Sequence, residues 1–184
     1  LLIEAGERVG GAVRSAELTL PGFLHDTCSA IYPLTVGSPY LSKLPLERHG
    51  LRWVQPPLAL AHPLDDGTAA VLSQRPDETA ESFDDSGDGR AWLGLFLPLA
   101  TQWERLAGAF LGPFRPFQDP LLMARFGLTG LRSAEALARG RFHGFRARAL
   151  FAGIAGHSIL PLDLVPTAAF GLVLGATGHS VGWP

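Results

Sequence analysis

The residues best suited to chemistry lie close together near the start of the chain. The apolar run at residues 1–3 leads to Glu4, and the glycine pair Gly10-Gly11 follows shortly after. In dinucleotide-binding folds, a parallel strand ends in an acidic residue whose carboxylate accepts hydrogen bonds from ribose hydroxyls. We therefore predict that residues 1–4 form the end of a buried parallel strand, with Glu4 at its tip. The nucleotide-binding interpretation depends on that placement.

Two further features of this segment suit a nucleotide. Adjacent glycines, as in Gly10-Gly11, let the backbone turn tightly and pass close to a ligand. Arg14 offers a guanidinium that can form charge-assisted hydrogen bonds with a diphosphate. The complete fingerprint also has a G-x-G-x-x-G motif before the acidic residue, and the chain starts too late to include it. The alternative interpretation is therefore that Glu4 is a solvated carboxylate and that Gly10-Gly11 is an ordinary turn.

A second motif, Gly178-His179-Ser180-Val181-Gly182, matches the G-x-S-x-G nucleophile elbow of serine hydrolases. It follows the apolar run at 170–174, and Ser180 would be the nucleophile. The elbow needs a helix after the serine and a later acid and histidine, whereas Trp183-Pro184 comes next here. A serine hydrolase is therefore the weaker alternative, and a non-catalytic interaction module is a third.

The composition is typical of a folded domain and argues against a nucleic-acid-binding protein. Of the 184 residues, 47% are hydrophobic and 17% are charged, and the formal net charge is −2. No run of about 18 apolar residues is present, so we predict no transmembrane helix. No basic segment opens the chain, so we expect no secretory signal and a cytoplasmic location, with peripheral membrane contact left open.

Cysteine and histidine usage gives no sign of a disulfide or a metal site. Cys28 is the single cysteine, and we expect it to be a small buried residue. The six histidines lack metal-ligand spacing, so we expect hydrogen-bonded structural roles for them. A basic cluster in the second half of the chain is interpreted as a solvated helix face, with contact to anionic lipid or cofactor phosphates as the alternative. The cluster consists of Arg139, Arg141, Arg146 and Arg148.

Hydrophobic periodicity and turn residues predict a ribbon and small sheet followed by helices, an α/β or α+β pattern. Asp65-Asp66-Gly67 indicates a hairpin turn. A helix is expected to begin near Pro76, capped by Asp77 or Ser73, before a solvated turn at 82–90. The expected extended segments are 12–20, 51–54, 58–62 and 69–73. The expected helices are 91–111, 133–139 and 145–155, and 165–176 is either a helix or a strand.

The segment from Glu4 to Gly11 resembles the second-strand motif of FAD-dependent amine oxidases and phytoene desaturases. Later segments resemble the phytoene desaturase-like branch of NAD(P)/FAD-dependent oxidoreductases, and the resemblance covers nearly the whole chain. These segments are Leu20-Pro21-Gly22-Phe23-Leu24-His25-Asp26, Ser38-Pro39-Tyr40, His49-Gly50-Leu51, Ala61-His62-Pro63-Leu64-Asp65-Asp66-Gly67, Ala124-Arg125-Phe126-Gly127-Leu128 and Gly178-His179-Ser180-Val181-Gly182-Trp183-Pro184.

The resemblance implies a Rossmann-type FAD-binding domain, of which residues 1–30 would be a part, and a mixed-sheet and helical substrate domain at 31–184. It further implies that FAD accepts a hydride from a hydrophobic small molecule. Glu4 would hold the adenosine ribose, and many relatives carry arginine where this chain has Ala12. The other residues implied at the cofactor are Ala5, Arg8, Gly10, Gly11 and Arg14.

The two ends of the sequence indicate part of a larger protein. The first residue is Leu1 inside an apolar run, and the pattern continues up to Pro184. We therefore expect these residues alone to bind FAD weakly or not at all and to be inactive. The helix predicted at 91–111 is expected to form ordinary core, with the lining of an apolar substrate tunnel as the alternative.

Overall fold

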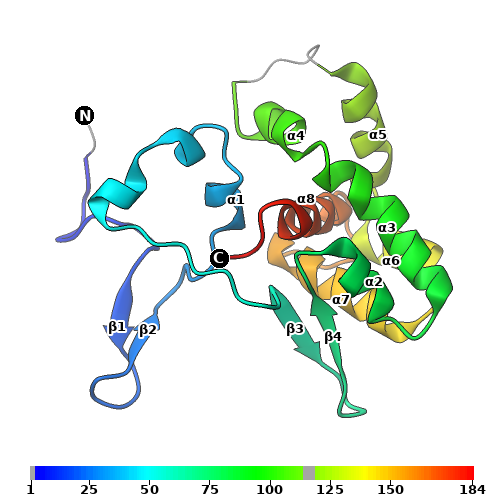
Figure 1. Cartoon of the computed structure of the whole chain (residues 1–184), viewed down its shortest axis with the longest axis horizontal. Helices are drawn as coiled ribbons and strands as arrows, with labels where there is room; N and C mark the ends of the chain where they lie inside the picture. The colour runs from blue at the N-terminus through cyan, green and yellow to red at the C-terminus, as the bar shows by residue number, and fades with distance from the viewer. Residues whose placement is uncertain (1–2, 114–118) are drawn as a thin grey trace. The chain divides into compact units, whose positions relative to one another are not determined.

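The computed structural model describes residues 3–113 and 119–184 (Figure 1). The chain divides into two compact units, Leu1–Tyr32 and Pro33–Pro184. Both sheets among the described residues are antiparallel pairs of strands, and helices make up most of the second unit. The coarse α+β prediction is therefore confirmed.

The first unit is organised around a β-hairpin. Strand β1 (Ser15–Glu17) pairs antiparallel with β2 (Leu24–Asp26), so that Ser15 lies opposite Asp26. The Ser15 hydroxyl also donates a hydrogen bond of 2.7 Å to Asp26 Oδ1. Gly22 turns the chain with a φ of +85°, which glycine adopts without strain. The predicted extended segment at 12–20 is confirmed over the three residues of β1.

The small sheet of the second unit is the hairpin that the Asp-Asp-Gly signal predicts. Strand β3 (Leu60–Pro63) pairs antiparallel with β4 (Ala69–Leu72). Asp66 Oδ1 accepts a 2.9 Å hydrogen bond from the Thr68 amide, and Gly67 has a φ of +81°. Ala70 and Leu72 face inward and are buried, so β4 contributes one edge of the hydrophobic core.

Helices form the rest of the second unit, and three of them begin at side-chain caps. Asp85, Asp119 and Ser133 each accept a hydrogen bond from a backbone amide in the first turn of their helix. The α-helices are α1 (Pro33–Val36), α2 (Pro76–Glu81), α3 (Ser86–Ala100), α4 (Trp103–Phe110), α5 (Pro120–Gly130), α6 (Ala134–Arg141), α7 (Phe145–Ala155) and α8 (Thr167–Ser180). Short 3₁₀ turns occupy Leu41–Lys43, Leu46–His49 and Gly156–Ser158.

Helix α8 is the central element of the second unit and contacts α3, α5, α6 and α7 (Figure 1). Small residues on α8 allow this close packing. A Cβ on Gly171 would lie 2.9 Å from Phe151 Cζ, so the ring occupies the space a side chain would need. Trp92 and Phe96 of α3 pack against each other with their ring centroids 4.4 Å apart, and both are fully buried. The inner face of α3 is therefore core.

Several predicted elements differ from the structure. Residues 51–54 are not a strand, and the side chain of Val54 is 77% exposed. The predicted helix at 91–111 begins earlier, at Ser86, and is interrupted after Ala100. There the Gln102 side-chain amide donates a hydrogen bond of 3.1 Å to the Pro98 carbonyl. In a continuous helix, that carbonyl would accept from the backbone amide of Gln102 instead. Arg75, not Asp77 or Ser73, occupies the cap position of α2.

The apolar run at 165–176 is resolved as the helix α8, and α7 has the predicted bounds. Helix α6 begins one residue after its predicted start, with Ser133 as its cap. Helix α5 was not predicted. None of the helices in the described ranges is both long enough and apolar enough to cross a membrane.

Candidate functional site

The N-terminal segment brings Glu4 and Arg14 to the same glycine. Glu4 Oε1 accepts a hydrogen bond of 2.8 Å from the Gly6 amide. A Cβ on Gly6 would lie 3.3 Å from that oxygen and 3.4 Å from Arg14 Nη2. The carboxylate and the guanidinium therefore both lie beside the Gly6 backbone, where they present opposite charges to solvent.

The glycine pair forms the turn between Glu4 and the hairpin. Gly10 and Gly11 have φ values of +125° and +56°, and the Val13 amide donates a 2.9 Å hydrogen bond to the Gly10 carbonyl. A Cβ on Gly10 would lie 2.8 Å from Val13 O, whereas one on Gly11 would meet no atom within 4 Å. Gly10 is therefore required by the turn, and Gly11 leaves open space beside the backbone.

The hairpin fixes the backbone of Arg14. Its carbonyl accepts hydrogen bonds from the Thr27 amide at 2.9 Å and from the Thr27 hydroxyl at 3.1 Å. Ala5 and Arg8 lie on the exposed loop between Glu4 and the glycine pair. No hydrogen bond or ion pair within residues 3–32 ties the Arg8 side chain to Glu4 or Arg14. The structure thus brings together Glu4 and Arg14, but not Ala5 or Arg8.

The predicted strand at residues 1–4 is wrong for the two residues that the structure describes there. Ile3 and Glu4 have no strand conformation, and Ile3 is 82% exposed. Leu1 and Leu2 lie outside the described residues. A buried parallel strand needs hydrogen-bonded neighbours, and the two described sheets are antiparallel pairs that do not include residues 3–4. Glu4 therefore reaches Gly6 from a loop, which counts against the strand-tip role expected for it.

Cys28 is also placed differently from the prediction. The thiol is free, and the residue is exposed. The apolar side chains around it are exposed as well, with Leu24 at 73% and Phe23 at 60%. The described residues of the first unit contribute no member to the hydrophobic core, so they offer no interior in which Cys28 could be buried.

Ser180 does not lie on a nucleophile elbow. It is the last residue of α8, so a helix precedes it, and the turn at Gly182 with a φ of +78° follows. The elbow instead places its serine between a strand and a helix, where the hydroxyl is presented on a sharp turn. The neighbouring His179 turns away to Trp92 and Gln74. The geometry therefore does not support the hydrolase alternative.

His179 is a buried structural histidine, as the sequence predicts for the histidines in general. Its Nε2 accepts a 2.8 Å hydrogen bond from Trp92 Nε1, and its Nδ1 lies 3.4 Å from the Gln74 carbonyl. Because Trp92 can only donate, Nε2 is the unprotonated nitrogen. Burial lowers the pKa of His179 to about 4 and outweighs the Gln74 and Ser73 carbonyls, which raise it. The ring is therefore neutral at pH 7.

Asp88 is a buried residue that sequence reasoning missed, because residues 82–90 were predicted to be a solvated turn. Its two carboxylate oxygens accept hydrogen bonds of 2.7 and 2.6 Å from the amides of His143 and Gly144. The carboxylate thereby ties α3 to the start of α7. Both partners are backbone amides far along the chain, so no local pattern could have identified the contact.

The solvated face predicted for the basic cluster is found at Arg139 and Arg141, which are exposed, whereas Arg146 and Arg148 are half-buried, and three of the four arginines have protein partners. Arg139 pairs with Glu135 at 2.8 Å, and Arg146 pairs with Asp84 at 3.1 Å. Arg148 Nε donates a 2.7 Å hydrogen bond to the Phe142 carbonyl. Arg141 differs from these three because no acceptor for it is found among the described residues.

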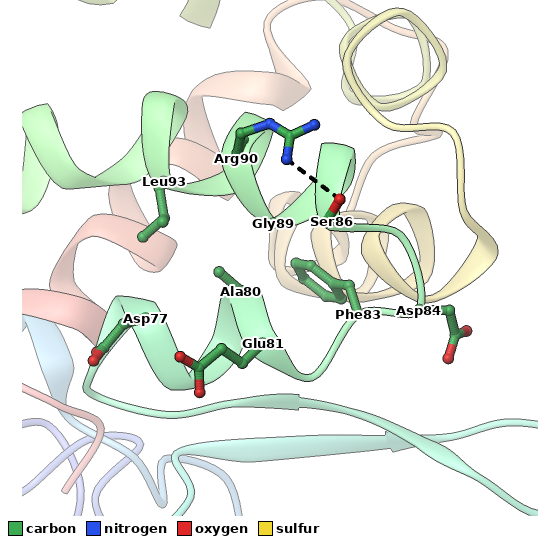
Figure 2. A pocket seen from close by; sticks show the side chains of 9 residues that line it. All are labelled: Asp77, Ala80, Glu81, Phe83, Asp84, Ser86, Gly89, Arg90 and Leu93. Atoms are coloured by element: carbon green, nitrogen blue, oxygen red, sulfur yellow. Dashed lines mark hydrogen bonds between the residues drawn. The ribbon is translucent and has the colours of Figure 1, made fainter.

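The groove between α2 and α3 has a volume of about 410 Å³ (Figure 2). Apolar side chains of Ala80, Phe83 and Leu93 line it, and carboxylates project around it, with Glu81 and Asp77 on the α2 side. Asp84 adds a third carboxylate to the lining and Arg90 a single guanidinium, so the lining is net negative and disfavours an anionic diphosphate. This groove is therefore not a candidate for a dinucleotide.

Among residues 3–113 and 119–184, no group of three or more histidine, cysteine or acidic side chains is placed to hold a metal ion. Comparisons with protein-family models, with curated proteins and with solved structures found no match to this chain.

Proposed function

We propose that this chain is part of a FAD-dependent oxidoreductase that dehydrogenates or desaturates a hydrophobic small molecule. The observation that carries the proposal is that Glu4 and Arg14 both lie beside Gly6, next to a turn that needs Gly10. Resemblance of motifs along nearly the whole chain to the phytoene desaturase-like branch supports the same function. The Rossmann-type assignment of residues 1–30 and a cytoplasmic location belong to this proposal.

The chemistry of these residues fits the adenosine diphosphate half of FAD. A carboxylate accepts hydrogen bonds from the two hydroxyls of a ribose, and Glu4 is exposed and able to do so. A guanidinium donates to diphosphate oxygens, and Arg14 has no ion pair within the described part of the chain. The open space beside Gly11 leaves room for a ligand near the backbone.

Because Ile3 and Glu4 lie in a loop, the proposal requires residues 1–4 to become a strand when neighbouring strands are present. A parallel strand at residues 1–4 forms only if neighbouring strands pair with it, and the described residues supply none. When bound, FAD supplies a two-electron acceptor for the substrate. The chain's own part is to hold the nucleotide through Glu4 and Arg14. The inner faces of α3 and α4 are packed in the core, which agrees with the expectation that this helical stretch forms ordinary core and not a substrate tunnel.

The test is the absorbance spectrum of the product of the intact gene, followed by titration of the apoprotein with FAD. Glu4→Gln and Arg14→Gln are each expected to weaken FAD binding about tenfold, because each removes a charge-assisted hydrogen bond. Glu7→Gln is the matched control, since it removes the same charge from the same exposed loop. A product without flavin would overturn the proposal and favour the non-catalytic module.

A further inference from the structure

A second site is indicated in the helical unit by a small recess between α3, α5, α6 and α8. The recess has a volume of about 80 Å³. Its apolar lining comes from core side chains: Leu99 is 6% exposed, Phe126 is 8% exposed and Leu172 is fully buried. The recess is thus a rigid depression in the core surface and not a gap between mobile loops.

Two arginines line this recess without protein partners. Arg125 extends from the middle of α5, and Arg141 is the last residue of α6. Among the described residues, neither guanidinium has an ion pair or hydrogen bond. Thr129 lies one turn after Arg125, and its hydroxyl likewise has no described partner. The recess therefore presents two cations and a neutral donor.

Arg141 lies beside Gly94 of α3. A Cβ on Gly94 would lie 3.8 Å from Arg141 Nη2, so the guanidinium lies over the backbone of α3. Arg141 thus lies at the recess, whereas Arg139, the other arginine of α6, pairs with Glu135.

No carboxylate on the surrounding helices is left to neutralise these cations. Asp88 on α3 is occupied by two backbone amides, and Glu135 on α6 pairs with Arg139. The described spans of α5 and α8 contain no acidic residue, and Asp119, which caps α5, pairs with Arg105. The positive charge of the recess is therefore available to a ligand.

We propose that this recess binds a phosphate group through Arg125 and Arg141. Guanidinium groups match the oxygens of a phosphate, and the threonine hydroxyl adds a neutral hydrogen bond. A recess of about 80 Å³ holds a single tetrahedral anion and excludes a nucleotide. The phosphate can belong to a free phosphate compound or to a lipid head group. The site lies wholly within the second unit and does not depend on the proposed flavin.

The first test uses the full 184-residue chain and inorganic phosphate, titrated at low ionic strength and followed by calorimetry. Saturable binding is expected, and Arg125→Gln and Arg141→Gln should each weaken it at least tenfold. Arg139→Gln is the matched control, because it removes the same charge from α6 at a residue that does not line the recess. Thermal unfolding of each variant shows that the fold is kept, since all three side chains are exposed.

The second test identifies the source of the phosphate. Flotation with phosphatidylcholine vesicles, with and without phosphatidic acid, is compared for the same variants. Binding that needs phosphatidic acid, Arg125 and Arg141 supports a lipid head group, whereas phosphate binding without flotation supports a free compound. Failure to bind either probe, or equal losses in Arg139→Gln, would overturn the proposal.

Discussion

At the scale of single residues, the buried polar groups of the second unit mainly join its elements through hydrogen bonds. His179 receives the Trp92 N–H, and Asp88 receives two backbone amides of the segment before α7. Each joins elements that are distant in sequence, and each is buried. Burial makes such groups costly unless their bonds are satisfied, so they favour one arrangement of the helices.

The lowered pKa of His179 predicts a stability that falls with acid. The ring has a pKa of about 4 in the folded protein against 6.5 in the unfolded chain. Between these values the unfolded chain takes up a proton that the folded protein does not. The contribution of His179 to the free energy of unfolding is therefore complete above about pH 6.5. It decreases as the pH falls toward 4, and below that pH about 3 kcal/mol has been lost.

Urea unfolding at a series of pH values measures this loss. His179→Gln should unfold with a shallower pH dependence than the wild type, because glutamine does not titrate. Trp92→Phe is expected to be less stable at every pH but to keep the fall, since burial and not the Trp92 bond is the main cause of the low pKa. Identical pH profiles for the wild type and His179→Gln would show that the ring is not buried as described.

At the scale of elements, Gly67 determines the β3–β4 hairpin through its backbone conformation alone. A Cβ there would meet no atom within 4 Å, but the φ of +81° is unfavourable for any side chain. We expect Gly67→Ala to lower the free energy of unfolding by about 1 kcal/mol. Gly108→Ala in α4 is the control, because it has equal space and no positive φ; it should stabilise by up to about 1 kcal/mol. Urea midpoints that move in the same direction for both variants would contradict this.

Elements with a strong local signal were predictable from the sequence. The Asp65-Asp66-Gly67 turn set the position of the β3–β4 hairpin, and α7 has the bounds that its apolar spacing predicts. Elements that depend on distant partners were not predictable. Helix α5 carries glycines at 127 and 130, which obscure its periodicity, and it is held by contact with α8. The strand expected at residues 1–4 failed for the same reason, because strands need partners.

The candidate sites were likewise predictable from local residue patterns but not where they depend on distant partners. Glu4 and the glycine pair were identified from residue type and spacing, but the conformation that brings Glu4 to Gly6 could not be. Arg141 was grouped with its sequence neighbours as a solvated face. Arg141 instead lies beside Gly94 of α3, in a recess that Arg125 of α5 also lines. Only the fold brings these positions together.

At the scale of the whole molecule, the hydrophobic core belongs to one of the two units. Its described members lie between Ala70 and Trp183. The first unit instead exposes its apolar side chains, including Ile3 at 82%, Leu24 at 73% and Val9 at 71%. Apolar burial is the main favourable term in folding, so the second unit holds most of the stability of the chain.

The chain 33–184 is therefore expected to fold without residues 1–32. It should unfold in one cooperative transition, with a melting temperature within about 4 °C of the full chain, because a loss of about 1 kcal/mol shifts a domain of this size by that amount. Near-ultraviolet circular dichroism, which reports the packing of Trp92 and its neighbours, should match that of the full chain before the transition and be lost in it. A gradual, non-cooperative melt of 33–184 would show that the first unit is needed to complete the fold.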